Sequence, residues 1–249
     1  ARKFGDLLMA NLYRLKKGER SAVVEDYYED GSPQTEIPLD ALKTPLQNAA
    51  AFYKAYNKAK TAEKYLSELL VRGEKEEEYL LGVLDEISRC ESERALSEIR
   101  LELTETGFIR PQKPGKGEKS GETSPMRFLS SSGFEILAGR NNTQNDKLTT
   151  KRARRTDIWL HVQKLHGSHV VISCGGAEPD ESALLEAAVI AAYYSQARGS
   201  GKVPVDYTQV RFVKKPSGAM PGAVVYTDYK TVLAEPDEKR VFALKQPDA

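Results

Sequence analysis

One long stretch of helical periodicity constrains this chain more than any other feature. Thr44-Pro45 supplies a helix start, because Thr is a favoured cap and Pro is tolerated in the first turn. Apolar residues then fall at seven-residue spacing in two rows, which are Ala49, Tyr56, Leu70 and Leu84, and Phe52, Ala59, Leu66, Leu80 and Ile87. Glu63, Glu77 and Gly73 interrupt the two rows. This spacing predicts a single helix that runs to about Cys90 and carries a coiled-coil seam.

A coiled-coil seam requires a second helix, and the rest of the chain holds no segment of comparable length and periodicity. The alternative is an ordinary core helix of a bundle. The sequence also opens at Ala1 directly in a helical pattern, without a Met. We therefore expect a piece of a longer protein whose partner helix lies upstream.

Shorter elements flank the long helix. Before it, the patterns predict a helix and a two-stranded hairpin, over residues 4–15, 21–29 and 36–39. After it, residues 93–106 predict a second helix. Residues 110–124 are rich in Pro, Gly, Lys and Ser and lack an apolar anchor, so they predict a linker.

The pattern changes after residue 125. Short apolar runs predict strands over 126–130, 134–138, 157–162, 168–174, 207–213, 222–227 and 230–234. An alanine-rich segment over 181–197 predicts one strong helix, with acid at its start and Gly199 after its end. Strands around one helix indicate a mixed α/β domain.

The expected fold class is therefore α+β, in four segments. These are a helix with a β-hairpin over 1–43, the long helix with a short following helix over 44–109, a flexible linker over 110–124, and the mixed α/β domain over 125–249.

Charge and cysteine content narrow the class of protein. The net charge is only +1, but acid gathers at Glu74 to Glu78 and base at Lys147 to Arg155, which suits nucleic-acid binding through one region. Cys90 and Cys174 are the only cysteines, so a disulfide framework is excluded and a reducing compartment is favoured. No apolar run approaches the roughly twenty residues that cross a bilayer. We expect a cytoplasmic protein without a membrane partner or a cofactor.

The run GRNNTQND at residues 139–146 concentrates amide side chains after a predicted strand. Amides both donate and accept hydrogen bonds, as the reading of base edges or ribose hydroxyls requires. Arg140 is expected to add a phosphate contact or a stacking plane. The alternative is a capping-rich turn in which Asn142 or Thr143 starts a short helix.

Two further basic stretches lie near in sequence. Five cations follow the amides, namely Lys147, Lys151, Arg152, Arg154 and Arg155. They form either a solvated face or an RNA surface. Lys214 and Lys215 then open a Pro- and Gly-rich loop to Gly222, which is either a phosphate-gripping loop or a plain hairpin connection.

All three histidines, His161, His166 and His169, fall within nine residues. A metal site is the weakest interpretation, because convergent ligands are not evident. His161 or His169 could donate to phosphate, and a structural role is the simplest interpretation. Trp159 alternates with apolar neighbours and is expected in the core rather than as a stacking platform. We see no catalytic triad or nucleophile elbow and expect no enzyme activity.

Several of these motifs resemble one family. The runs GRNNTQND (139–146), DIWLHV (157–162), GSHVVI (167–172) and VRFVKKPSGAMPG (210–222) resemble the C-terminal NFACT-R domain of the NFACT family. This is a family of bacterial ribosome-quality-control proteins that also carries the name fibronectin-binding protein A. GDLLMANLY (5–13), NAAAFYKAYNKAK (48–60) and EEYLLGVLDEI (77–87) are similar to the family's coiled-coil middle region. The resemblance covers nearly the whole chain.

The resemblance implies a function in ribosome quality control. Such proteins bind a large ribosomal subunit obstructed by peptidyl-tRNA and recruit alanyl-tRNA, and the stalled chain then gains a C-terminal alanine tail without mRNA. The hairpin over 18–40 would form the tip of a coiled-coil arm that reaches the stalk base. The family's N-terminal domain with its Asp-Arg motif is absent here, so we expect no tailing by this chain alone. His166 also stands where the family often has proline, so that turn is expected to differ.

Resemblance and residue patterns together give the candidate RNA-binding residues. They are Arg140, Asn141, Asn142, Gln144, Asn145, Asp146, Lys151, Arg152, Arg154, Arg155, His161, His169, Lys214 and Lys215. The family's older name leaves a surface adhesin that binds fibronectin as the alternative.

Overall fold

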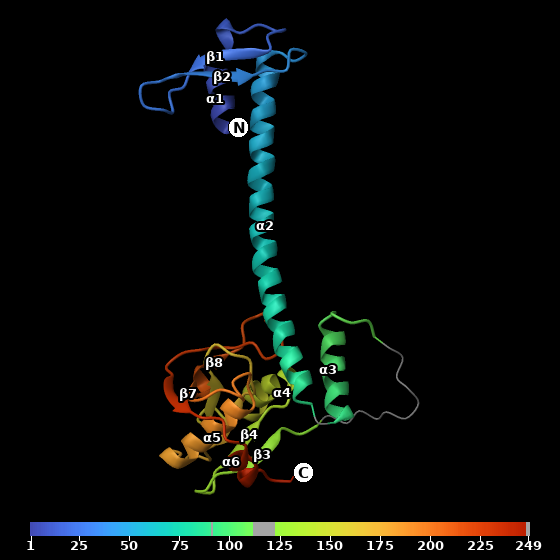
Figure 1. The fold of residues 1–249 in the computed structure, drawn as a ribbon, viewed down its shortest axis with the longest axis vertical. Helices are drawn as coiled ribbons and strands as arrows, with labels where there is room; N and C mark the ends of the chain where they lie inside the picture. Colours follow the sequence, from blue (N-terminus) through green and yellow to red (C-terminus); the bar gives the residue numbers. More distant parts are fainter. Residues whose placement is uncertain (91, 112–122, 248–249) are drawn as a thin grey trace. The chain divides into compact units, whose positions relative to one another are not determined.

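The structure is a computed structural model, and it describes residues 1–90, 92–111 and 123–247. Contacts divide the chain into two compact units, Ala1–Lys75 and Glu76–Ala249. The division falls inside the long helix α2, Pro45–Ser88 (Figure 1). The bounds expected from Thr44-Pro45 and from the heptad spacing are thus confirmed to within two residues.

The first unit is a small hairpin domain built on the start of α2. Its elements are α1 (Arg2–Ala10), the 3-10 helix η1 (Leu12–Arg14), β1 (Ser21–Glu25) and β2 (Gln34–Pro38). The strands pair antiparallel, and their alternating pattern turns Ala22, Val24 and Ile37 onto Leu7 and Leu8 of α1. The predicted helix and hairpin are both present.

The exposed stretch of α2 bears on the coiled-coil prediction. Residues 57–75 are exposed on every side, and Leu66 and Leu70 of the predicted seam are 53% and 66% exposed. Apolar side chains in a seam are stable when a second helix covers them. Within the described part of the chain no element covers this stretch, so coiled-coil pairing stays a prediction.

A six-stranded antiparallel sheet organises the second unit. Its order is β10-β7-β5-β6-β4-β3. The strands are β3 (Met126–Leu129), β4 (Glu135–Ala138), β5 (Ile158–Val162), β6 (Val170–Ser173), β7 (Val203–Gln209) and β10 (Lys230–Ala234). A separate two-stranded hairpin joins β8 (Val213–Lys214) to β9 (Val225–Tyr226) after the 3-10 helix η3 (Val210–Phe212).

Different elements cover the two faces of this sheet. The alanine-rich helix α5 (Glu181–Tyr193) and α6 (Glu238–Leu244) pack on the face that carries Leu160 and Val205. The opposite face carries Trp159 and Val171 and is covered by three elements. These are α4 (Asn142–Lys147), the π-helix η2 (Leu148–Arg152) and the β8–β9 hairpin. We call this second side the α4 face.

Helix α3 (Glu93–Glu105) packs beside the last turns of α2. Tyr79 and Val83 of α2 and Ile99 of α3 form a small core of their own, with Met220 at its edge. The second unit therefore includes the end of α2 and all of α3, as well as the sheet.

The expected fold class is confirmed, with local differences. The strand expected over 207–213 instead begins at Val203 and ends at Gln209. The prediction places its start too late because a proline, here Pro204, usually argues against a strand. Helix α6 was not expected. Most of the linker predicted over 110–124 lies outside the described residues. Among the described helices, none is both long and apolar enough to cross a membrane.

Candidate nucleic-acid interface

The amide-rich run forms the start of α4. Asn141 has extended backbone angles, and its side chain accepts a hydrogen bond from the N–H of Gln144 at 2.8 Å, so it is the N-cap. The side chains of Asn141, Gln144 and Asn145 are 2–3% exposed. The capping interpretation of this run is therefore the one the structure supports.

Carboxylates of α3 satisfy the buried amides. One oxygen of Glu98 accepts from Nδ2 of Asn141 at 2.9 Å and from Nε2 of Gln144 at 3.0 Å. One oxygen of Glu102 accepts from the backbone N–H and the hydroxyl of Thr143, at 2.9 and 2.8 Å. Since charged acceptors form the stronger hydrogen bonds, α3 is firmly tied to the first turn of α4.

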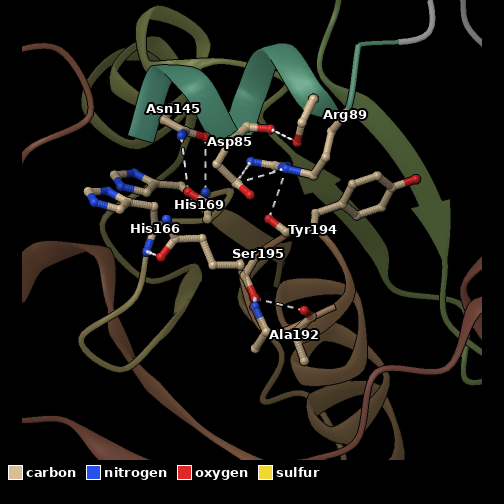
Figure 2. Close-up of polar contacts among 12 residues, drawn as sticks. Asp85, Arg89, Asn145, His166, His169, Ala192, Tyr194 and Ser195 are labelled. Atoms are coloured by element: carbon tan, nitrogen blue, oxygen red, sulfur yellow. Dashed lines mark hydrogen bonds and ion pairs between the residues drawn. The ribbon is translucent and has the colours of Figure 1, made fainter. Parts of the chain in front are cut away.

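Asn145 ties α4 to the sheet from its other side. Its Oδ1 accepts from the N–H of His169 at 2.9 Å, as Figure 2 shows, and its Nδ2 donates to the carbonyl of Gly167 at 3.5 Å. The side chain lies so close to Gly139 that a Cβ there would stand 2.1 Å from Oδ1. This explains why glycine opens the run.

The structure thus gives the three buried amides a positioning role. They were predicted to contact RNA, but their hydrogen-bonding groups are turned inward and lie out of reach of a surface ligand. Asn142 and Asp146 are half-buried. Asp146 accepts from the N–H of Gly222 at 3.0 Å and pairs with Lys215, so it holds the 214–222 loop against α4.

A second buried carboxylate lies beside Glu102. Glu86, on the last turns of α2, is 5% exposed, and one of its oxygens has no hydrogen-bond partner among the described residues. Burial, together with the nearby charge of Glu102, raises the pKa of Glu86 well above its usual value. The pair therefore favours a state in which Glu86 is protonated.

The histidines and the tryptophan form an aromatic cluster under α4. Trp159 is fully buried and stacks on His161, with centroids 5.7 Å apart and planes at 14°. His169 meets Trp159 edge-on at 5.2 Å, and its Nδ1 lies 2.8 Å from the hydroxyl of Thr149. Burial lowers the pKa of His161 to about 4 and that of His169 to about 3, so both rings are neutral near pH 7.

This arrangement fits the structural interpretation of the two histidines. His169 is buried, neutral and already bonded on both its backbone and its ring, so it is a poor phosphate ligand. His161 is half-buried, and its ring is neutral and stacked on Trp159. Their predicted contact with RNA finds no support in this geometry. Trp159 is a core residue, as expected. Among the described residues, no group of three His, Cys, Asp or Glu side chains could hold a metal ion.

The predicted cations after α4 are exposed, unlike the buried amides. Lys151 and Arg152 lie at the end of η2, and Arg154 and Arg155 lie in the loop that leads to β5. The buried carboxylate of Asp157 fixes that loop, because it accepts from the N–H of Arg154 at 2.7 Å and from the N–H of Cys174 at 3.0 Å. Short π-helices are common at functional sites.

One cation that the sequence did not single out joins this group. The backbone N–H of Arg211, on η3, donates to the carbonyl of Arg155 at 3.2 Å. Its side chain is exposed and covers the ring of Phe212 at 4.7 Å. Only the tertiary structure reveals this neighbour, because 56 positions separate the two arginines in the chain. We call Lys151, Arg152, Arg154, Arg155 and Arg211 the cation cluster.

Lys214 and Lys215 lie at the start of the loop that leads to Gly222. Lys214 points outward from β8, because its neighbour Val213 packs into the core of the α4 face. Lys215 is engaged by Asp146. Arg140 donates from Nε to the carbonyl of Ser124 at 3.0 Å. The structure therefore keeps Lys214 as an open candidate and gives Lys215 and Arg140 internal contacts.

The end of α2 is also fixed to this unit. Arg89 bonds the carboxylate of Asp85 through two nitrogens, at 2.7 and 3.0 Å, and reaches the carbonyl of Tyr194 at 3.2 Å (Figure 2). Tyr194 is the C-cap of α5, so a cation here meets the negative end of that helix. A Cβ on Gly82 would stand 2.8 Å from the ring of His166, which shows how closely α2 packs.

Comparison with known protein families places both parts of the chain. Residues 1–122 match the NFACT N-terminal and middle domains, and residues 125–228 match the NFACT protein RNA binding domain. The second match contains α4, the whole cation cluster and the 214–222 loop.

Individual relatives extend the match to nearly the whole chain. The Rqc2 homolog RqcH of Bacillus subtilis is 46% identical over 245 residues, which is 98% of this chain and 42% of that protein. The protein of the same name from Streptococcus pneumoniae serotype 2 is 38% identical, with 98% and 44% covered. The chain thus spans less than half the length of these curated relatives.

A solved structure is also similar. The C-terminal part of the fibronectin/fibrinogen-binding protein from Streptococcus suis superposes with a TM-score of 0.73 at 30% identity. The match covers 98% of this chain and 86% of that one.

Proposed function

Because this chain belongs to the NFACT family, we propose that it is the RNA-binding part of a ribosome quality-control factor. The cation cluster is the observation that supports this most directly. Its five side chains are exposed and lie inside the segment that matches the family's RNA-binding domain. Lys and Arg side chains on one surface are the usual partners of nucleic-acid phosphates.

The proposed partners are tRNA and the large ribosomal subunit. By its resemblance to the family, the protein recruits alanyl-tRNA to subunits obstructed by peptidyl-tRNA, for mRNA-independent alanine tailing of stalled chains. The hairpin of the first unit contacts the stalk base in this proposal. The similarity to proteins named Rqc2 homolog supports the assignment to ribosome quality control.

We assign the residues of the α4 face two roles. The cation cluster and Lys214 contact phosphates, while the buried Asn141, Gln144 and Asn145 hold α4 in place beneath them. Peptide-bond formation belongs to the ribosome in this proposal, and the chain acts in the cytoplasm without an active site or a cofactor of its own.

A fibronectin-binding adhesin is the second candidate. It rests on the name of the similar Streptococcus suis structure, which calls that protein fibronectin/fibrinogen-binding. Nothing in the cation cluster argues for this partner.

Co-sedimentation distinguishes the two functions. The chain is mixed with purified large ribosomal subunits and, separately, applied to immobilised fibronectin. Recovery with the subunits, lost at high salt, together with no retention on fibronectin, is the expected result. Retention on fibronectin without recovery on subunits would favour the adhesin.

A further inference from the structure

The exposed charges of the α4 face are held on a fixed backbone. Asp157 fixes the loop that carries Arg154 and Arg155, and the N–H of Val210 donates to the carbonyl of Asp157 at 2.9 Å. Arg211 is tied to Arg155 through the backbone. The backbone positions of Arg154, Arg155 and Arg211 are therefore set before any ligand arrives, which lowers the ordering cost of binding a rigid partner.

Most of the amide side chains and aromatic rings near these charges are withdrawn from the surface. Three of the four amide side chains at α4, those of Asn141, Gln144 and Asn145, bond to Glu98 and to backbone atoms around His169, while the fourth, Asn142, is half-buried. Trp159 is fully buried, and the guanidinium of Arg211 covers the ring of Phe212. Of these amides only Asn142 is partly exposed, and neither Trp159 nor Phe212 offers an uncovered ring on which a base could stack.

We propose that the cation cluster binds the phosphate backbone of double-helical RNA and does not read base sequence. This inference rests on the proposed RNA-binding function and names its substrate class. Phosphate contacts position a nucleic acid without conveying its sequence, whereas sequence readout needs contacts to base edges. Recognition of duplex RNA proceeds mainly through shape, phosphates and 2′-hydroxyls.

Single-stranded RNA fits this surface less well. Proteins that bind single strands gain much of their affinity by stacking successive bases on aromatic rings. A single strand also has a lower charge density than a duplex and must lose its own flexibility on a rigid cation set. Tyr229 is 48% exposed in this unit, but a single ring packed edge-on against Tyr226 is no stacking channel.

Fluorescence anisotropy with three labelled RNAs tests the inference on the 249-residue chain. Two are hairpins with stems of about 16 base pairs and unlike sequences, and the third is oligouridine with the same number of nucleotides. We expect the hairpins to bind within about twofold of each other and oligouridine to bind at least about tenfold more weakly.

Variants then show which residues carry the binding. The double variant Arg155→Ala/Arg211→Ala is expected to weaken both hairpins equally. The matched control, Lys202→Ala/Lys239→Ala, removes the same charge from other exposed positions and is expected to bind as the parent does. Tyr229→Ala is expected to change none of the three affinities.

The possible failures are distinguishable. Three results would contradict the inference while leaving RNA binding in place. They are oligouridine binding as tight as that of the hairpins, a preference of about tenfold or more for one hairpin sequence, and loss of binding in Tyr229→Ala. If a folded chain binds none of the three RNAs, both this inference and the proposed function are overturned.

Discussion

Glu102 on α3 accepts hydrogen bonds from both the backbone N–H and the hydroxyl of Thr143, at the first turn of α4. The other oxygen of Glu102 accepts from the hydroxyl of Tyr79 on α2 at 2.7 Å. A single buried carboxylate thus joins three helices, and it crosses the boundary at residues 122–125 between the two family matches. The RNA-binding unit of this chain therefore extends upstream of that boundary, to α3 and the end of α2.

Loss of this junction is expected to destabilise the second unit. Glu102→Ala leaves the N–H of Thr143 and the hydroxyl of Tyr79 buried without an acceptor, so the free energy of unfolding falls by about 3 kcal/mol. Urea unfolding followed by the fluorescence of Trp159, the only tryptophan, measures the change. Glu105→Ala, exposed on the same helix, is the control and should change stability by less than about 0.5 kcal/mol. Equal stability of both variants would contradict the junction.

Removing the charge of Glu86 is not expected to destabilise the protein, in contrast to Glu102→Ala. Because its pKa is raised by burial, the folded state retains a proton that the unfolded state releases above the ordinary value of 4.5. Stability from this group therefore falls as the pH rises above 4.5, and it is lowest once the folded state is also ionised. Glu86→Gln removes that loss, so it should be neutral or stabilising at pH 7. A Gln variant as unstable as Glu102→Ala would show that the ionised carboxylate is required.

The two histidines with lowered pKa values, His161 and His169, make stability rise with pH, the opposite of the effect of Glu86. Their lowered pKa values, about 4 for His161 and about 3 for His169, mean that the unfolded chain takes up protons below pH 6.5 while the folded chain does not. Their contribution to stability is complete above pH 6.5 and is lost as the pH falls toward 4, with a slope of up to about 1.4 kcal/mol per pH unit for each ring. Urea midpoints from pH 7 to 5 test this, and His161→Gln should flatten the profile. A profile unchanged in that variant would mean that the ring takes up its proton over the same pH range in the folded and the unfolded chain.

Lys214 is expected to contribute one phosphate contact. Lys214→Ala should weaken tRNA binding and reduce the slope of log K against log salt by about one. Arg140→Ala should have a smaller effect, since its guanidinium already donates to the carbonyl of Ser124. Unchanged affinity and slope in Lys214→Ala would remove the 214–222 loop from the interface.

The elements that the sequence predicts best are those set by local patterns. Thr44-Pro45 and the heptad spacing place α2, and alternating apolar residues place β10 at Lys230–Ala234. β7 is misplaced in the prediction because Pro204 obscures its first residues. Helix α6 is short, and its inward residue Val241 is recognisable only once α5 is in place.

In the candidate site, too, local sequence predicts some features and tertiary packing sets the others. Exposure of the cations follows from their charge, and it needs no knowledge of the fold. The burial of Asn141 and Gln144 depends on Glu98, which lies more than 40 positions upstream in the sequence and meets them only through tertiary packing. The run GRNNTQND carries no local sign of that partner, so its amides are as compatible with RNA contact as with capping until α3 is placed. Arg211 was missed for the same reason.

The central claim is that the cation cluster binds RNA, and a salt titration of tRNA binding tests it most directly. The measurement compares the parent chain with the variant Lys151→Ala/Arg152→Ala/Arg154→Ala/Arg155→Ala, after urea unfolding has shown that both are equally stable. We expect salt-sensitive binding by the parent, and in the variant a weaker affinity with a slope reduced by about three to four. Binding by the variant with the affinity and slope of the parent would contradict the claim.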